Sequence, residues 1–173
     1  MYTLARLLDV DPAELMALQR ELVDRGDTVA VAESLTGGLL AAVLTGTPGA
    51  SAVIRGGLVV YATDLKASLA GVDAELLADR GAVDPDVARQ LAAGARRRLG
   101  ATWGIGVTGV AGPDPQDGRP VGTVFVAVAG PDAIRDDAAR HSGDRDEVRA
   151  AAVRQAVRLL RSAVREHPSG IPR

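Results

Sequence analysis

The sequence contains no cysteine, and this absence excludes several kinds of site at once. Disulfide bonds, thiolate zinc sites and cysteine nucleophiles all need that side chain. Histidine is nearly as scarce, because His141 and His167 are the only two and neither belongs to an H-E-x-x-H pattern. The sequence therefore offers very little from which to build a metal site, and we expect no metal.

Long apolar runs and clustered positive charges are missing too. No apolar run approaches the roughly 20 residues of a membrane-spanning helix, and no cationic start precedes an apolar core and a cleavage site. The formal net charge is −2, and the only arginine-dense run is RRR at 96–98. A nucleic-acid-binding protein usually shows a broad basic face. We therefore expect a soluble cytoplasmic protein that binds neither a membrane nor nucleic acid.

Lysine is almost absent. Lysine and arginine together number 20, yet Lys66 is the only lysine. Arginine serves as well as lysine in surface ion pairs, but only lysine readily loses its proton when it is desolvated. Composition alone leaves two interpretations: Lys66 has a role that arginine cannot fill, or it is a surface lysine kept by chance.

The order of predicted elements indicates the fold class. With 173 residues and 47% apolar content, the chain is long enough for one well-buried core, so we expect a single domain over residues 1–173. The pattern predicts a helix pair or broken helix at 4–24, a helix N-capped by Thr36, one at 64–69 capped by Thr63, and further helices at 73–80, 85–99 and 147–166. It predicts strands at 28–33, 53–61, 102–108, 121–129 and 133–141. Strands alternate with helices early and pair as a hairpin late, which favours a three-layer α/β/α sandwich with a mixed parallel and antiparallel sheet.

Polar residues stand where three of the predicted strands end. They are Glu33 and Ser34, followed by Thr36, Gly37 and Gly38; Tyr61 and Lys66; and Thr108 and Gly109, followed by a long loop. In open α/β sheets, ligands bind beyond the carboxyl ends of the strands. We therefore expect these residues to converge on one cleft.

The chemistry of this set suggests a nucleophile and a base. Ser34 falls at a strand-to-helix turn, where amides near Gly37 and Gly38 would stabilise an oxyanion or a phosphate. A serine nucleophile needs a base, and a desolvated Lys66 beside Tyr61 would be neutral enough to serve. Neither histidine lies at a convincing position.

Each of these residues also has a structural interpretation. Ser34 before Thr-Gly-Gly would be a helix cap, Tyr61 would end a strand, Thr108 would be a β-branched strand residue, and Glu33 would offset a positive charge. Arg145 and Arg149, one turn apart, would form a solvated helix face paired with Asp144 or Glu147. The G-x-G-x-x-G match at 104–109 is rejected as a dinucleotide fingerprint, because its glycines lie in or at the end of a strand and lead into a proline-rich loop.

Four ordered segments resemble one known family. They are VAESLTGG (31–38), GGLVVYATDLKASLAGV (56–72), GVTGVAGPDP (106–115) with RPVGTVFVAV (119–128), and HSGDRDEVRAAAV (141–153). Together they resemble the carboxy-terminal domain of the competence-damage protein CinA, whose standalone forms are nicotinamide-nucleotide amidases. The resemblance covers about residues 14–165, and we expect this chain to be such a standalone form.

The resemblance implies a reaction and a site. It implies hydrolysis of the carboxamide of nicotinamide mononucleotide to nicotinic acid mononucleotide and ammonia, in pyridine-nucleotide recycling, by a Ser/Lys amidohydrolase without metal or other cofactor. The catalytic residues fall on Ser34, Lys66 and Tyr61. We expect Glu33, Thr36, Gly37, Gly38, Thr108, Gly109 and Arg145 to bind substrate. Leu35, Thr63 and Asp64 depart from the residues expected there, which bears on substrate preference.

Other functions remain open at this stage. A non-catalytic module would bind a nucleotide phosphate through Thr36, Gly37, Gly38 and the arginines, with Ser34 as a cap. A partner-binding module related to competence or DNA damage is the third class. We also expect a homo-oligomer, most simply a dimer, because the final helix is rich in alanine and the first is apolar.

Overall fold

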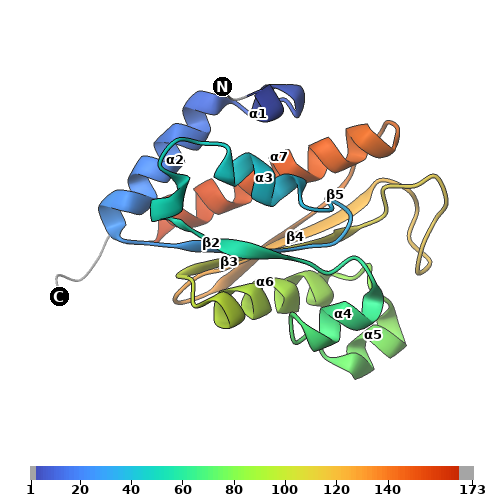
Figure 1. The fold of residues 1–173 in the computed structure, drawn as a ribbon. Coiled ribbons are helices and arrows are strands. Elements are labelled where there is room, and N and C mark those ends of the chain that lie inside the picture. The colour runs from blue at the N-terminus through green and yellow to red at the C-terminus, as the bar shows by residue number, and fades with distance from the viewer. Residues whose placement is uncertain (1–2, 168–173) are drawn as a thin grey trace.

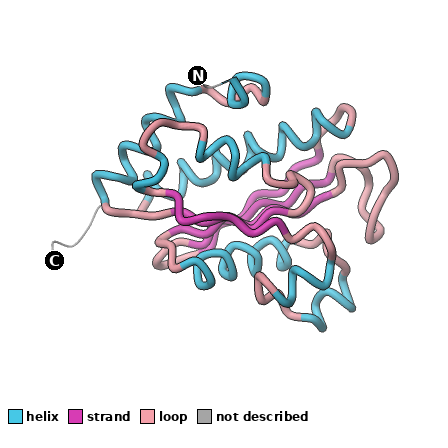
Figure 2. The backbone as a smooth tube through the Cα atoms, viewed as in Figure 1, coloured by secondary structure: helices cyan, strands magenta, loops and turns pink. Residues whose placement is uncertain are grey.

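Five strands form one mixed sheet with helices on both faces, as predicted (Figures 1 and 2). The computed structural model describes residues 3–167. The strands are β1 (Val29–Glu33), β2 (Ile54–Val59), β3 (Trp103–Gly109), β4 (Thr123–Ala129) and β5 (Ile134–Arg140), in the spatial order β2-β1-β3-β4-β5. β1 pairs in parallel with both β2 and β3, while β4 is antiparallel to β3 and to β5.

The helices form two layers (Figure 1). One face of the sheet is covered by α1 (Thr3–Leu7), α2 (Pro12–Arg25), α3 (Leu39–Thr45) and α7 (Arg145–Glu166). The other face is covered by α4 (Thr63–Ser68), α5 (Ala74–Arg80) and α6 (Pro85–Leu99). A short 3-10 helix, η1 (Ala50–Ala52), precedes β2. The broken helix predicted at 4–24 is therefore a pair, and α2 begins at Pro12 because the Asp11 side chain accepts from the Ala13 amide.

Small residues on the sheet let α6 pack closely against β3. A Cβ at Gly104 would lie 2.0 Å from the Ala92 carbonyl oxygen, and one at Gly106 would lie 2.2 Å from that of Ala88. Only glycine tolerates such an approach of helix backbone to strand. These two glycines of the rejected dinucleotide pattern are thus packing residues inside β3, as their strand position suggested.

Two predicted helix caps are wrong. α3 begins at Leu39 with Gly38 at the N-cap position, and Thr36 does not cap it. Its first amides are instead bound by the carboxylate of Glu33 at the end of β1. α4 includes Thr63 in its first turn, follows Ala62 and has no side-chain cap. Thr36 lies two residues before the N-cap position of α3 and Thr63 lies one residue after that of α4, and neither helix has a side-chain cap at that position.

The order of the strands positions the site. β1 lies between β2 and β3, all three run in the same direction, and their carboxyl ends therefore meet at one edge of the sheet. The chain leaves β1 toward β2 on one side and later returns as β3 on the other, so this edge is a topological switch point. Ser34, Tyr61 and the loop 109–120 all follow these ends.

Candidate active site

A cleft lies at this edge of the sheet and collects half of the predicted site residues. Its lining consists of Ser34, Leu35, Tyr61, Val83, Thr108, Gly109, Val110, Ala111, Gly112, Asp114, Gln116 and Arg145. Of the residues predicted to catalyse or bind substrate, the lining includes Ser34, Tyr61, Thr108, Gly109 and Arg145. Glu33, Thr36, Gly37, Gly38 and Lys66 lie outside it, and their contacts explain why.

Ser34 stands at the first position after β1. Its amide donates to the carbonyl of Val107 at 3.0 Å, which continues the β1–β3 ladder by one residue. Its hydroxyl has no hydrogen-bond partner among residues 3–167, and the residue lines the cleft. The helix-cap interpretation of Ser34 is not supported, because α3 begins five residues later. The hydroxyl is therefore available to a bound molecule.

Lys66 is buried, with 1% of its surface exposed, and it is not part of the cleft lining. Its Nζ donates to the backbone carbonyls of Val60, at 2.9 Å, and Tyr61, at 3.1 Å. No carboxylate forms an ion pair with it and no hydrogen bond joins it to Ser34 within the described part of the chain. Desolvation lowers the pKa of the Lys66 ammonium from 10.5 to about 8, against the opposing charges of Asp117 and Asp64.

The contacts of Val60 indicate the side of the chain on which the Lys66 amine lies. The Val60 amide donates to the Glu33 carbonyl at 2.8 Å, so this peptide faces β1. In an extended strand the N–H and C=O of one residue point toward the same neighbouring strand. Val60 directly follows β2, and continuation of the strand geometry puts its carbonyl, with the Lys66 Nζ bound to it, on the side that faces β1.

Tyr61 and Arg145 meet at the mouth of the cleft. Arg145 Nη2 donates to the Tyr61 hydroxyl at 2.9 Å, and Arg145 Nη1 donates to the carbonyl of Gly112 at 2.6 Å. The Tyr61 residue is 58% exposed, and its contact with Lys66 is made by the backbone carbonyl. The guanidinium thus links the end of β2 to the loop 109–120, and places a permanent positive charge at the entrance.

Glu33 supports the turn between β1 and α3. It is fully buried, its Oε2 accepts from the amides of Gly38 and Leu40, and its Oε1 accepts from that of Ala41. A carboxylate at a helix N-terminus satisfies the unpaired amides and interacts favourably with the helix dipole. Glu33 therefore fixes α3 relative to β1. Its contacts lie outside the cleft, where we predicted that it would bind substrate.

The amides expected to receive an oxyanion are already in use. The Gly37 amide donates to the Ser34 carbonyl at 3.0 Å, and the Gly38 amide donates to Glu33. The amides of Leu35 and Thr36 have no acceptor among the described residues, and the Thr36 hydroxyl is buried without a partner. The two free amides directly follow Ser34, so an oxyanion site at this turn would use them. The glycines instead allow the turn, since Gly37 and Gly38 have φ of +59° and +96°.

Thr108 joins the end of β3 to the turn before α6. Its hydroxyl donates to the Ala82 carbonyl at 2.6 Å, so the side chain is both part of the cleft wall and a structural tie. From the other side, Asp117 Oδ2 accepts from the amides of Ala82 and Val83, at 2.7 and 3.1 Å. The turn 81–83 is thus held between β3 and the loop 109–120.

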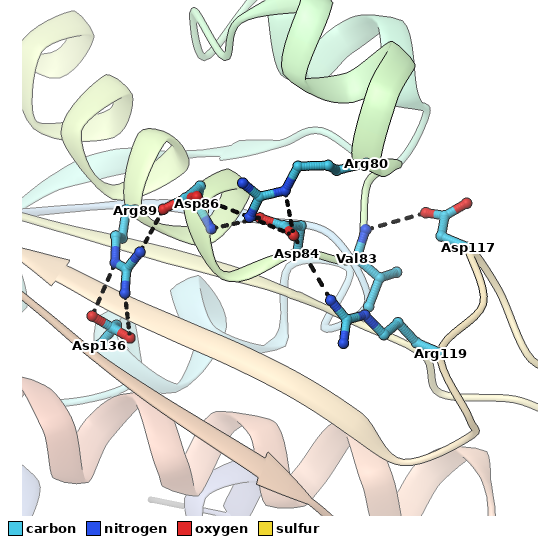
Figure 3. Close-up of polar contacts among 8 residues, drawn as sticks. All are labelled: Arg80, Val83, Asp84, Asp86, Arg89, Asp117, Arg119 and Asp136. Carbon is cyan, nitrogen blue, oxygen red and sulfur yellow. Dashed lines mark hydrogen bonds and ion pairs between the residues drawn. The ribbon is translucent and has the colours of Figure 1, made fainter.

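A network of arginine and aspartate side chains lies next to the turn 81–83, at the start of α6 (Figure 3). Arg119 lies 3.8 Å from Asp84, the residue that caps α6, and Arg80 donates to both oxygens of the same carboxylate. Arg80 also contacts Asp86, at 2.8 Å. The second half of the cleft loop is therefore held at Asp117 and Arg119, which fixes the wall opposite Ser34.

Arg149 was not predicted as a site residue. Its Nε donates to the Leu35 carbonyl at 3.1 Å and its Nη2 to the Thr36 carbonyl at 3.2 Å. The predicted partners Asp144 and Glu147 instead form a capping box at the start of α7, and the acid beside Arg149 is Asp146. The sequence signal available was only a helical spacing of four from Arg145, which is equally typical of a solvated face.

Neither histidine belongs to the cleft. His141 Nε2 is hydrogen-bonded to Gln155 Oε1, and His167 lies against Trp103 and Asp132. Within residues 3–167 no group of three or more histidine, aspartate or glutamate side chains is arranged to hold a metal ion. No helix in the same range is long and apolar enough to cross a membrane.

Comparison with known proteins agrees with the fold and with the order of the motifs. The sequence profile of the CinA C-terminal domain matches residues 13–164. A CinA-like protein from Frankia casuarinae is 56% identical over 140 residues, which are 81% of this chain and 32% of that protein. The chain spans about a third of the length of the curated relatives it matches.

Two crystal structures show the same arrangement of elements. Competence damage-inducible protein A from Klebsiella pneumoniae superposes with a TM-score of 0.86 at 33% identity, covering 91% of this chain and 99% of that one. A competence-damaged protein (CinA) superfamily member from Escherichia coli gives 0.83 at 31% identity, covering 87% and 88%. None of these three names states a reaction.

Proposed function

The chain belongs to the CinA C-terminal domain family, and from this premise and the geometry of the cleft we propose that it is an amidohydrolase. The substrate that fits the motifs is nicotinamide mononucleotide, hydrolysed at its carboxamide to nicotinic acid mononucleotide and ammonia. The observation that carries the proposal is Lys66. The only lysine of the chain is 1% exposed, forms no ion pair within the described residues, and has a pKa lowered to about 8.

Such a lysine has the properties of a general base. A buried lysine would normally be paired with an acid, because an unpaired buried ammonium is costly. Lys66 is held instead by two neutral carbonyls, those of Val60 and Tyr61, which orient the amine without an opposing charge. An arginine could not give up its proton here, which accounts for one lysine among nineteen arginines.

The proposed reaction has two halves. Neutral Lys66 takes the proton of the Ser34 hydroxyl as Oγ attacks the carboxamide carbon, giving a tetrahedral oxyanion. The C–N bond then breaks, and Lys66 returns the proton to the leaving nitrogen. Ammonia departs, and the acyl group remains as an ester on Ser34. Water, deprotonated by Lys66, attacks this ester; the bond between the acyl carbon and Ser34 Oγ breaks, Lys66 returns the proton to Oγ, and nicotinic acid mononucleotide is released. Catalytic hydrogen bonds commonly shorten when substrate binds, and this step requires the Lys66 amine to exchange one of its two carbonyl partners for Ser34 Oγ.

The remaining groups of the cleft have matching roles. The free amides of Leu35 and Thr36 would receive the oxyanion, where a preorganised donor is worth about 100-fold in rate or more. Arg145 would bind the phosphate, since its planar fork matches two phosphate oxygens and it stands at the cleft mouth. The loop 109–120, with Thr108 and Gly109, would bound the ribose.

Ammonia release from nicotinamide mononucleotide tests the proposal. The wild type should release ammonia, and Ser34→Ala and Lys66→Arg should each lower kcat by at least about 100-fold, because each removes one half of the nucleophile–base pair. Lys66→Met, which is neutral and of similar length, separates the loss of a base from the strain of fitting a guanidinium.

Two outcomes would contradict the proposal. Ammonia release by Lys66→Arg at the wild-type rate would exclude proton acceptance by residue 66. A folded wild type that binds the nucleotide without turnover would favour a nucleotide-binding module instead. Thermal melting of all variants serves as the control for folding.

A further inference from the structure

The guanidinium of Arg149 is hydrogen-bonded to the turn that follows Ser34. It comes from α7, more than a hundred residues away in sequence, and donates to the carbonyls of Leu35 and Thr36. A Cβ at Gly37 would lie 3.5 Å from Arg149 Nη2, so the guanidinium also lies beside Gly37. Two consecutive peptide groups are thus held by one rigid, permanently charged fork.

These contacts fix where the neighbouring amides point. The Leu35 carbonyl, bound by Arg149, shares a peptide group with the Thr36 amide. The Ser34 carbonyl, bound by the Gly37 amide, shares one with the Leu35 amide. In a planar trans peptide the N–H points opposite to the C=O. The amide of Thr36 therefore points away from Arg149, and that of Leu35 points away from the bond that closes the turn.

Both amides are left without an acceptor in a buried place. Leu35 and Thr36 are 4% and 0% exposed, and neither amide has a hydrogen-bond partner within the described chain. The Thr36 hydroxyl, also buried, is a third group without a partner. A buried amide without a partner costs free energy, and adjacent free amides form an anion-binding nest. Leu35 and Ser34 also line the cleft, so the nest lies beside the nucleophile.

We propose that Arg149 is a positioning residue for the oxyanion formed on Ser34: it holds the peptide group that joins Leu35 to Thr36, so that the Thr36 amide faces the oxyanion. By binding the Thr36 carbonyl it also fixes the Gly37 amide, which holds the Ser34 carbonyl and with it the peptide group of the Leu35 amide. The role rests on the proposed function. A positive charge on the carbonyl side of a peptide also polarises it, which strengthens its N–H as a donor. Arg149 touches no substrate in this account and acts only through the backbone.

A solvated ion pair does not account for these contacts. The acid beside Arg149 is Asp146, 3.2 Å away and 87% exposed, and such exposed pairs contribute little to stability. The Arg149 side chain is 25% exposed and directs two of its nitrogens inward. Asp146→Asn therefore offers a matched control, because it removes the ion pair and leaves both bonds to the turn.

The kinetic test compares variants of three residues of the first two turns of α7. Arg149→Ala should lower kcat for ammonia release by about 10-fold or more while KM stays within about twofold, because the oxyanion forms only after substrate has bound. The kcat of Arg149→Lys should fall between those of the wild type and Arg149→Ala, since an ammonium can bind one of the two carbonyls. Asp146→Asn should keep the wild-type kcat. Arg145→Ala, one turn earlier, should raise KM instead. An unchanged kcat in Arg149→Ala, or a change in its KM alone, would overturn the role.

A second readout does not depend on activity. In ¹H–¹⁵N correlation spectra of the protein without additions, Arg149→Ala should shift the amide signals of Thr36 and Gly37, because Arg149 binds the carbonyls of their peptide groups. Those of Leu40 and Ala41, which Glu33 holds, should move less. If the wild type releases no ammonia but these signals move, the proposed reaction fails while the hold on the turn stands. If they do not move, the positioning role fails whatever the reaction is.

Discussion

At the residue scale, the proposed chemistry depends on the charges near Lys66. Asp117, on the loop 109–120, opposes the effect of burial most strongly, and Asp64, on the same helix as Lys66, does so less. β2 offers only neutral carbonyls, the Glu33 carboxylate is engaged with α3, and Arg145 is engaged with Tyr61 and Gly112. The pH at which Lys66 becomes neutral is therefore set by burial against one main acid.

Asp117→Asn should move the acidic limb of the pH–rate profile to lower pH. A base must be neutral to act, so activity falls as the pH drops below the pKa of Lys66, about 8. Removing a negative charge nearby lowers that pKa further, so the variant should stay active at lower pH. Asparagine keeps an oxygen for the amides of Ala82 and Val83, which isolates the charge.

The control for this prediction is Asp64→Asn. Asp64 acts on Lys66 in the same direction but less strongly, so its removal should give a smaller shift of the same sign. A limb that stays in place in Asp117→Asn, or moves to higher pH, would show that the rate does not report the protonation of Lys66.

Residues differed in how far the sequence could identify them. The scarcity of lysine singled out Lys66 and the end of a predicted strand singled out Ser34, and their catalytic roles stay predictions. The hold of Arg149 on Leu35 and Thr36 was not, because a side chain that binds backbone carbonyls carries no local pattern and the partners are more than a hundred positions apart. The free amides were assigned to Gly37 and Gly38 for a related reason: which amide remains unpaired depends on the turn that forms.

At the scale of single elements, α3 depends on a buried acid from a strand. A short helix of seven residues has little stability of its own, and Glu33 binds three of its first amides. The sequence predicted this helix but not its start, since the usual capping residues lie one to three positions before the helix, while Glu33 is six positions away. Strands β1 and β4 were easier, because runs rich in valine mark them directly.

Glu33→Gln should lower the free energy of unfolding by about 2 kcal/mol. The amide side chain has nearly the same shape, but it has one acceptor oxygen where the carboxylate has two, and it loses the charge that favours the helix dipole. Chemical denaturation measures the change. Asp11→Asn, at the exposed start of α2, keeps its single capping bond and should cost far less. Equal losses would mean that Glu33 is not the main support of α3.

At the scale of the whole molecule, the site is a product of strand order. The parallel trio β2-β1-β3 brings Tyr61, Ser34 and Thr108 to one edge, and the antiparallel return through β4 leaves the loop 109–120 as the opposite wall (Figure 1). The sequence predicted the mixed sheet and this convergence, because alternation of strands and helices favours parallel pairs. It did not predict how the loop is tied down at Asp117 and Arg119, which depends on contacts with α6 and the turn before it.

Titration of the Lys66 amine is the sharpest test of whether this residue can act as the base for Ser34. Protein labelled with ¹³C at the lysine ε-carbon gives one side-chain lysine signal, because the chain has one lysine. We predict a midpoint near pH 8, where the folded protein leaves a useful fraction of neutral amine at physiological pH. A midpoint at or above 10.5, the ordinary value of an exposed lysine, would show that residue 66 stays charged and cannot take the proton of Ser34.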